Sequence, residues 1–370
     1  MISAAELREL REATRRFVRA STPRGADEHE AAASAAPDRR VWTDMARRLG
    51  LQGVRVPEDL GGTGLDLEAE LVVHEEMGRA LHGGPFLPVV GQAVPGLLTL
   101  ARDGRVRAML TEIAAGTSVV VPADARWYDP QAAPPVLTGG GDEGTVTGVV
   151  PAVLAGAAAD SWLVPAGAGG RTVLALVRSG TAGATAEPMT TIDLTRGFAT
   201  LRLEDAAAVV LARDAEAERA RDAMEAGGAL ALAAECVGVA AEALDLTVSH
   251  VKVREQFGQV IGAFQGVKHQ LADLYVTLES ARSALAFAAR SAGADPPLRD
   301  AALAVARRRC GAAAFRIAGE AIHLHGGIGF TWEHPAHLYY RRAKTNQVLL
   351  DAGGRQAETI TAGVAALYAR

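Results

Sequence analysis

Cysteine is almost absent from this sequence of 370 residues, which contains only Cys236 and Cys310. The two form no CxxC pair, and the first 30 residues carry many charges and lack the apolar stretch of a secretory signal. We therefore expect a reducing, cytoplasmic environment. Both cysteines stand in apolar helical stretches, so we expect them in the core and not as nucleophiles.

An excess of either charge is also missing, since 38 basic and 43 acidic side chains give a net charge of −5. No run of like charge indicates a nucleic acid or an anionic membrane as a partner. The one long segment without Asp, Glu, Lys or Arg spans residues 80–101, and its prolines and glycines exclude a membrane helix. We predict a buried, turn-rich connection there.

No Walker loop is present, and no GxGxxG opens a helix after a strand. Helical periodicity in the first third gives way to short runs of Val, Leu and Thr and then returns. This order predicts an α+β protein of three domains: an N-terminal α-helical domain at 1–117, a central small β-barrel domain at 118–211 and a C-terminal four-helix bundle at 212–370. Three successive blocks argue against a doubly wound nucleotide-binding fold.

Two stretches could carry chemistry. The first, residues 253–265, places Arg254, Gln256, Phe257 and Phe264 at a helix–loop–helix junction. A guanidinium binds phosphate oxygens through paired donors, and aromatic rings stack on other rings. The residues alone favour a plainer interpretation, a capped loop whose phenylalanines pack into a core.

The second stretch, residues 322–334, contains paired glycines, Gly326 and Gly327, that would let a cofactor or a backbone approach closely. A helix C-cap with a tight turn explains the same pattern. Four histidines between 323 and 337 suggest a metal. A di-metal bundle needs a second ExxH motif, and Glu320 and His323 form the one ExxH in the helices, so we predict no metal.

Together, in this order and in an α-β-α chain of this length, the two stretches resemble the acyl-CoA dehydrogenase family. The resemblance extends over the whole chain. The loop at 57–64 is similar to the family's N-domain signature, and residues 341–344, Arg-Arg-Ala-Lys, resemble its arginine-aspartate-alanine-lysine motif. Family members form homotetramers or related assemblies, bind FAD between subunits and desaturate an acyl-CoA thioester. Their electrons pass to an electron-transfer flavoprotein.

The resemblance also implies site residues. Arg254, Gln256 and Phe257 match the motif that holds the FAD pyrophosphate and adenosine of a neighbouring subunit, and Phe264 and Gln265 match the next contact pair. His323 occupies a position that is usually glutamine in the family. Gly326 and Gly327 match the glycine pair that lies against the cofactor.

Both usual positions of the catalytic carboxylate differ from the family pattern. The common one corresponds to Leu350, and the one used by another branch corresponds to Gly228. Asp351, next to the lost glutamate, is the predicted base, and Glu235 on the first C-domain helix is a more remote candidate. A purely structural role is the favoured alternative for each of them. Asp351 would cap a helix, and Glu235 would be a surface charge.

The segments that contact the flavin ring in the family also differ in this sequence. The family's threonine-glutamate run and its tryptophan-isoleucine-threonine-asparagine strand have no counterpart at 121–127 or 150–154. The chain is similar to actinobacterial members that act on steroid side-chain thioesters, some of which are unlike pairs sharing one FAD. This implies an FAD-dependent acyl-CoA dehydrogenase for a bulky or steroid-derived acyl-CoA, or a subunit of one with an α2β2 partner. The alternatives are a non-catalytic scaffold and a flavoenzyme of secondary metabolism acting on a carrier-protein thioester.

Overall fold

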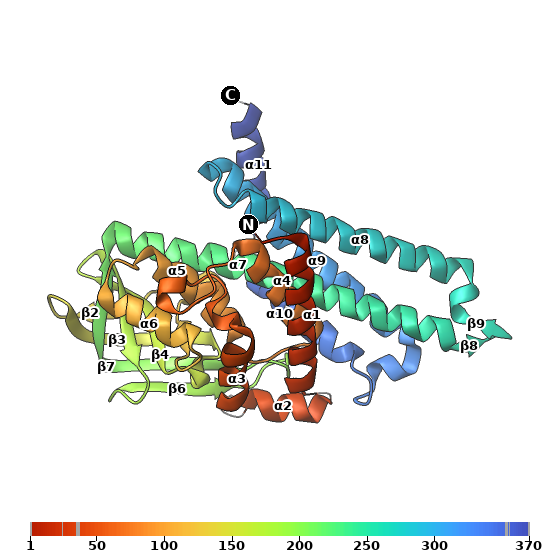
Figure 1. The fold of residues 1–370 in the computed structure, drawn as a ribbon, viewed down its shortest axis with the longest axis horizontal. Helices are drawn as coiled ribbons and strands as arrows, with labels where there is room; N and C mark the ends of the chain where they lie inside the picture. The colour runs from red at the N-terminus through yellow and green to blue at the C-terminus, as the bar shows by residue number, and fades with distance from the viewer. Residues whose placement is uncertain (1, 24, 35–37, 352–353, 355, 369–370) are drawn as a thin grey trace.

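The computed structural model describes residues 2–23, 25–34, 38–351, 354 and 356–368. Helices occupy the first third, strands the middle and helices the remainder, which confirms the predicted α+β order (Figure 1). None of the helices in these ranges has the length and continuous apolar surface that crossing a membrane requires.

The N-terminal part is an assembly of helices. They are α1 (Ala4–Ser21), α2 (Ala26–Ser34), α3 (Arg39–Leu49), α4 (Leu67–Arg79), α5 (Val94–Thr99) and α6 (Gly104–Ala114). Ser3 and Glu6 form a capping box that starts α1. The loop at 57–64 closes tightly, because a Cβ at Gly62 would lie 2.0 Å from the Val56 carbonyl oxygen, so only glycine fits.

The segment 80–101 is buried as predicted, but the prediction of a turn-rich connection was wrong. A π-helix, η3 (Leu87–Ala93), runs directly into α5. Pro88 stands in the first turn of η3, where no backbone N–H is needed, and Pro95 stands where η3 passes into α5. Gly96 serves packing, since a Cβ there would lie 2.4 Å from the Met224 side chain.

The central strands close into a small barrel. They are β1 (Val120–Pro122), β2 (Val136–Thr138), β3 (Glu143–Leu154), β4 (Ser161–Ala168), β5 (Arg171–Arg178), β6 (Ala184–Met189) and β7 (Phe198–Arg213). The order β4-β2-β3-β7-β5 returns to β4 through an antiparallel β4–β5 pairing, which closes the ring. β1 extends it beside β4, and β6 pairs with β7.

The C-terminal part is built on one long helix, α7 (Asp214–Val253). After it come the two-stranded hairpin β8 (Glu255–Gln256) and β9 (Gln259–Val260), then α8 (Gln265–Arg290), α9 (Pro296–His325), the 3-10 turn η7 (Gly326–Phe330), α10 (Ala336–Leu350) and α11 (Gln356–Tyr368). At 1.5 Å per residue, the 40 residues of α7 span about 60 Å. The barrel lies beside its first turns, and the β8–β9 hairpin projects from its far end (Figure 1).

Candidate functional site

The β8–β9 hairpin carries the predicted cofactor residues on an exposed tip. Arg254 caps α7, and its side chain and that of Gln256 are exposed. Phe257 has a φ of 54°, beside Gly258 at 80°, the backbone of a tight hairpin turn. The Phe257 ring is 93% exposed and meets Phe264 edge-on at 6.3 Å. The prediction that Phe257 packs into a core was wrong, because the turn points it outward.

The second predicted stretch lies next to the hairpin. The ring of His250, whose carbonyl oxygen accepts the Arg254 N–H, stacks at 4.4 Å on His325 at the end of α9. Gly326 then leaves the helix with a φ of 65°, and His323, Gly326 and Gly327 are exposed. The structure therefore brings together residues 253–265 and 322–334, while their roles toward FAD stay predictions.

Large apolar side chains surround this tip. Val253, Phe257, Ile328, Phe330 and Trp332 are between 50% and 93% exposed. Arg341 lies over the Trp332 ring at 5.3 Å. An apolar patch of this kind on a folded protein marks an interaction surface.

Asp351, the predicted base, lies apart from the hairpin at the end of α10. Its side chain is exposed and lines neither of the two cavities described below. Leu350 is only 2% exposed, and its carbonyl oxygen accepts hydrogen bonds from Arg307 Nε at 2.9 Å and Gln356 Nε2 at 2.8 Å. The position of the family's usual glutamate is therefore core.

The second base position is closed as well. Gly228 lies on α7 against η3, where a Cβ would come within 2.6 Å of Gln92 Cγ. A side chain has no room there unless the Gln92 side chain moves.

The two segments that differ from the family's flavin-ring side meet at one place, the barrel-edge cavity. Residues 122–128 form one wall and 150–154 another. Its volume is about 30 Å³, whereas ligand pockets start near 300 Å³. The Tyr128 hydroxyl donates a hydrogen bond to the Pro151 carbonyl oxygen and ties the two walls together, and Trp127 is buried beside it. The residues present do not fit a flavin ring here.

Glu235 belongs to a buried charge cluster that joins the central, strand-rich part of the chain to its C-terminal helices. The cluster consists of Asp193 and Arg196 from the β6–β7 loop, Glu235 from α7 and Arg342 from α10. Arg342 Nη1 lies 3.0 Å from Glu235 Oε1, and Arg342 Nε lies 3.0 Å from Asp193 Oδ2. Arg196 also donates to Glu235, and Asn346 donates to it at 2.9 Å.

This environment makes Glu235 an anchor and not a base. Burial raises the pKa of the Glu235 carboxyl, but Arg196, Arg342 and Asn346 outweigh burial and bring the pKa to about 2. A carboxylate of such low pKa binds a proton weakly. The sequence contains one signal for the cluster, the arginine at position 342. The motif that residues 341–344 resemble has an aspartate at this position. An arginine that is buried there needs carboxylates around it.

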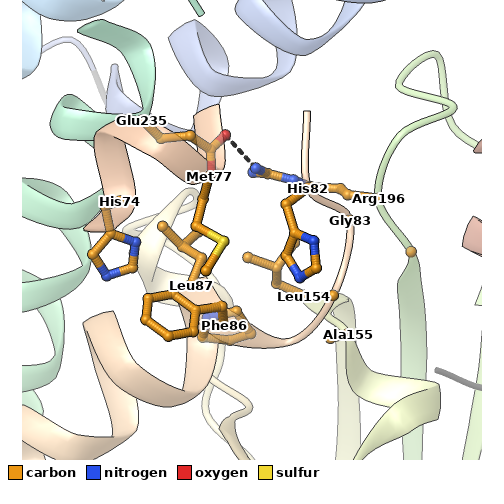
Figure 2. Close-up of a pocket in the computed structure, with 13 residues that line it drawn as sticks. His74, Met77, His82, Gly83, Phe86, Leu87, Leu154, Ala155, Arg196 and Glu235 are labelled. Carbon is orange, nitrogen blue, oxygen red and sulfur yellow. Dashed lines mark hydrogen bonds and ion pairs between the residues drawn. The ribbon is translucent and has the colours of Figure 1, made fainter. Parts of the chain in front are cut away.

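A second small cavity, the Glu235 cavity, lies beside the cluster. His74 and His82 face it from two sides, with Met77, Phe86 and Leu87 between them (Figure 2). Its volume of about 10 Å³ is close to the space that one water needs. Both ring nitrogens of fully buried His74 have no hydrogen-bond partner among the described residues, so we expect an ordered water there.

His82 makes the stability of the fold depend on pH. Burial and the Arg342 charge lower its pKa from 6.5 to about 4, so the fold disfavours the protonated ring. The resulting stabilisation is complete above pH 6.5 and is lost as the pH falls toward 4, by about 2 kcal/mol between pH 7 and pH 5. Urea unfolding should show that His82→Asn flattens this slope, whereas exposed His269→Gln leaves it unchanged. Equal slopes for His82→Asn and the unaltered protein would contradict this assignment.

Known proteins that match the chain share one family description. Residues 4–117 match the acyl-CoA dehydrogenase N-terminal domain, and residues 218–364 match the acyl-CoA dehydrogenase C-terminal domain. The acyl-CoA dehydrogenase IpdE2 of Mycobacterium tuberculosis is 33% identical over 315 residues, which are 85% of this chain and 83% of IpdE2.

Two solved structures of similar fold each carry a double name. The ChsE4-ChsE5 complex of Mycobacterium tuberculosis has a TM-score of 0.85 and 26% identity, over 99% of this chain and 98% of that chain. The Tcur3481-Tcur3483 steroid ACAD, a G363A variant, has a TM-score of 0.84 and 28% identity, over 99% of both chains.

Proposed function

The chain belongs to the acyl-CoA dehydrogenase family, oxidoreductases that act on a CH–CH bond of an acyl-CoA, and we propose that it works as one half of an unlike pair. In this pair the partner is a paralogous subunit that supplies the catalytic carboxylate and the flavin-ring pocket. This chain supplies the hairpin that holds the far end of the partner's FAD.

The closed barrel-edge cavity is the observation that carries the proposal. In a chain that keeps its own flavin, the two walls at 122–128 and 150–154 would have to stand apart. Here the Tyr128–Pro151 hydrogen bond holds them together around a space of about 30 Å³. The two positions of the family's catalytic carboxylate agree with the proposal. Leu350 is in the core and Gly228 is packed against Gln92, so neither position offers a carboxylate.

The length of α7 supports the sharing of a cofactor between chains. Glu225 of α7 lines the barrel-edge cavity, and Arg254 caps the same helix 29 residues later. At 1.5 Å per residue the two are about 44 Å apart along the helix axis. Arg254, Gln256 and Phe257 therefore face a cofactor other than one at this chain's own barrel. The Arg254 guanidinium would bind phosphate oxygens, and Phe257 would shield them from water.

The substrate we propose is a bulky, steroid-derived acyl-CoA, and the electron acceptor is an electron-transfer flavoprotein. The name of the Tcur3481-Tcur3483 steroid ACAD supports the first choice, and family membership supports the second. The chemistry that FAD would supply, when it is bound in the partner, is to accept the hydride from the substrate.

Asp351→Asn tests the division of labour in the purified pair. Because Asp351 is exposed at a helix end, we expect the kcat/KM for acyl-CoA oxidation to stay within about twofold. Replacement of the partner's carboxylate base should reduce it by orders of magnitude. A loss of more than tenfold in Asp351→Asn, with unfolding unchanged, would instead make Asp351 a base and this chain a dehydrogenase in its own right.

A further inference from the structure

Three histidine rings stack on one another at the base of the hairpin that carries Arg254. His250 stands in the last turn of α7, His325 is the last residue of α9, and His334 follows η7. The ring centroid of His325 lies 4.4 Å from that of His250 and 4.2 Å from that of His334. This group, which we call the histidine stack, therefore joins α7, α9 and the segment before α10 at one place.

The histidine stack also links the two segments that are predicted to hold FAD. The His250 carbonyl oxygen accepts the Arg254 N–H at 2.9 Å, so the hairpin begins from the backbone of a stacked residue. The Arg254 carbonyl oxygen accepts the Ile261 N–H at 2.8 Å and closes the hairpin. His325 comes directly before Gly326, whose φ of 65° turns the chain out of α9. The stack therefore sets how the hairpin lies relative to the glycine turn.

The hydrogen bonds of the stack fix where two of its rings carry a proton. His325 Nδ1 lies 2.6 Å from the Ala321 carbonyl oxygen, which can only accept, so this nitrogen carries a proton. His334 Nδ1 accepts the Ala336 N–H at 3.2 Å, so this nitrogen carries none. A proton added there would point at the Ala336 N–H. It would also place a positive charge at the amino end of α10, which the helix dipole disfavours.

The groups around the stack disfavour a positive charge as well. Burial lowers the pKa of His334 from 6.5 to about 4, and three histidine rings act in the same direction. These rings are His325 on α9, His250 on α7 and His337 on α10. Burial, the His325 ring and the Arg254 guanidinium lower the pKa of His250. The exposed carboxylate of Glu333 accepts a hydrogen bond from Thr331. The folded arrangement therefore holds His334 neutral.

We propose that the histidine stack is a proton-sensitive joint, which positions the hairpin for the partner's FAD while its rings are neutral and releases the cofactor when it is protonated. The inference rests on the proposed function, because it assigns a regulation to the same hairpin. In a loosened joint the His334 ring regains its ordinary pKa of 6.5, so protons bind the loose arrangement more tightly than the closed one. The closed arrangement is fully favoured above pH 6.5 and is lost as the pH falls toward 4.

Titration of the purified apo pair with FAD at pH 7 and pH 5.5 tests this coupling. We expect the dissociation constant to rise about three- to eightfold at pH 5.5, where the upper figure is the unscreened linkage of one group whose pKa moves from 6.5 to about 4. His334→Asn should bring the rise below about twofold, because the Asn Oδ1 accepts the Ala336 N–H but takes up no proton in this range. His269→Gln, at an exposed histidine of α8, should keep the full rise.

Hydrogen exchange of the pair without FAD follows the joint itself. After correction for the intrinsic pH dependence of exchange, the amides of residues 254–264 should lose protection at pH 5.5. The loss should appear in the unaltered pair and in His269→Gln, and it should be absent in His334→Asn. Because the unaltered pair gives this result without any substitution, the test stands even if a variant folds poorly.

An FAD dissociation constant at pH 5.5 that is equal to or below the value at pH 7 overturns the proposal, as does equal protection at both pH values or a rise that His334→Asn leaves intact. Arg254→Ala separates these failures from failure of the proposed function. If Arg254→Ala weakens FAD binding at pH 7 while the pH profile is flat, only the joint is refuted. If Arg254→Ala binds FAD as the unaltered pair does, the proposed function itself is refuted.

Discussion

Glu235→Ala is expected to lower the free energy of unfolding by about 3–5 kcal/mol, because it leaves two buried arginines without their shared carboxylate. Arg196 is 4% exposed and Arg342 is fully buried, so bulk water does not solvate the two charges that lose their partner. The cluster joins the β6–β7 loop, α7 and α10, and the loss should therefore appear as a single, earlier unfolding transition. Urea unfolding of the purified protein measures it.

Glu12→Ala is the matched control. Glu12 pairs with Arg16 at 3.9 Å on the exposed face of α1, where an ion pair contributes less than about 1 kcal/mol. If Glu235→Ala cost no more than Glu12→Ala, the buried cluster would not anchor the β6–β7 loop to α7 and α10.

Arg254→Ala is expected to weaken FAD binding by the pair about 10- to 100-fold. Charge-assisted hydrogen bonds to phosphate contribute about 1.5–3 kcal/mol each, and the exposed Arg254 side chain supports no core of its own. Unfolding of the variant should therefore be unchanged. Fluorescence titration of the apo pair with FAD gives the dissociation constant.

Arg308→Ala provides the comparison, since Arg308 is an exposed arginine of the same helical part. It should bind FAD as the unaltered pair does. Equal FAD affinity in Arg254→Ala and Arg308→Ala would show that the hairpin does not hold a cofactor.

The order of elements was predictable because helical and strand periodicities are local. The segment 80–101 was not, since its helices depend on Gly91 and Gly96 packing against α7, and glycine and proline look the same in a turn and in a close helix contact. The short strands β2 and β6 also lacked a local signal, because both take their register from long neighbouring strands.

The candidate site was likewise predictable only in part. Arg254 and Phe257 sit in a hairpin of a few residues, so their grouping was visible in the sequence. The cluster around Glu235 joins positions more than 100 residues apart, and the Tyr128–Pro151 closure depends on how two barrel segments meet. Such contacts depend on the folded barrel and bundle, and no local spacing predicts them.

The visible absorbance of the purified chain, alone and with its paralogous partner, tests the central claim most directly. We predict a colourless chain alone and about one FAD per two chains in the pair, with the flavin bleached by acyl-CoA. A yellow chain that alone retains one FAD and is bleached by acyl-CoA would contradict the account.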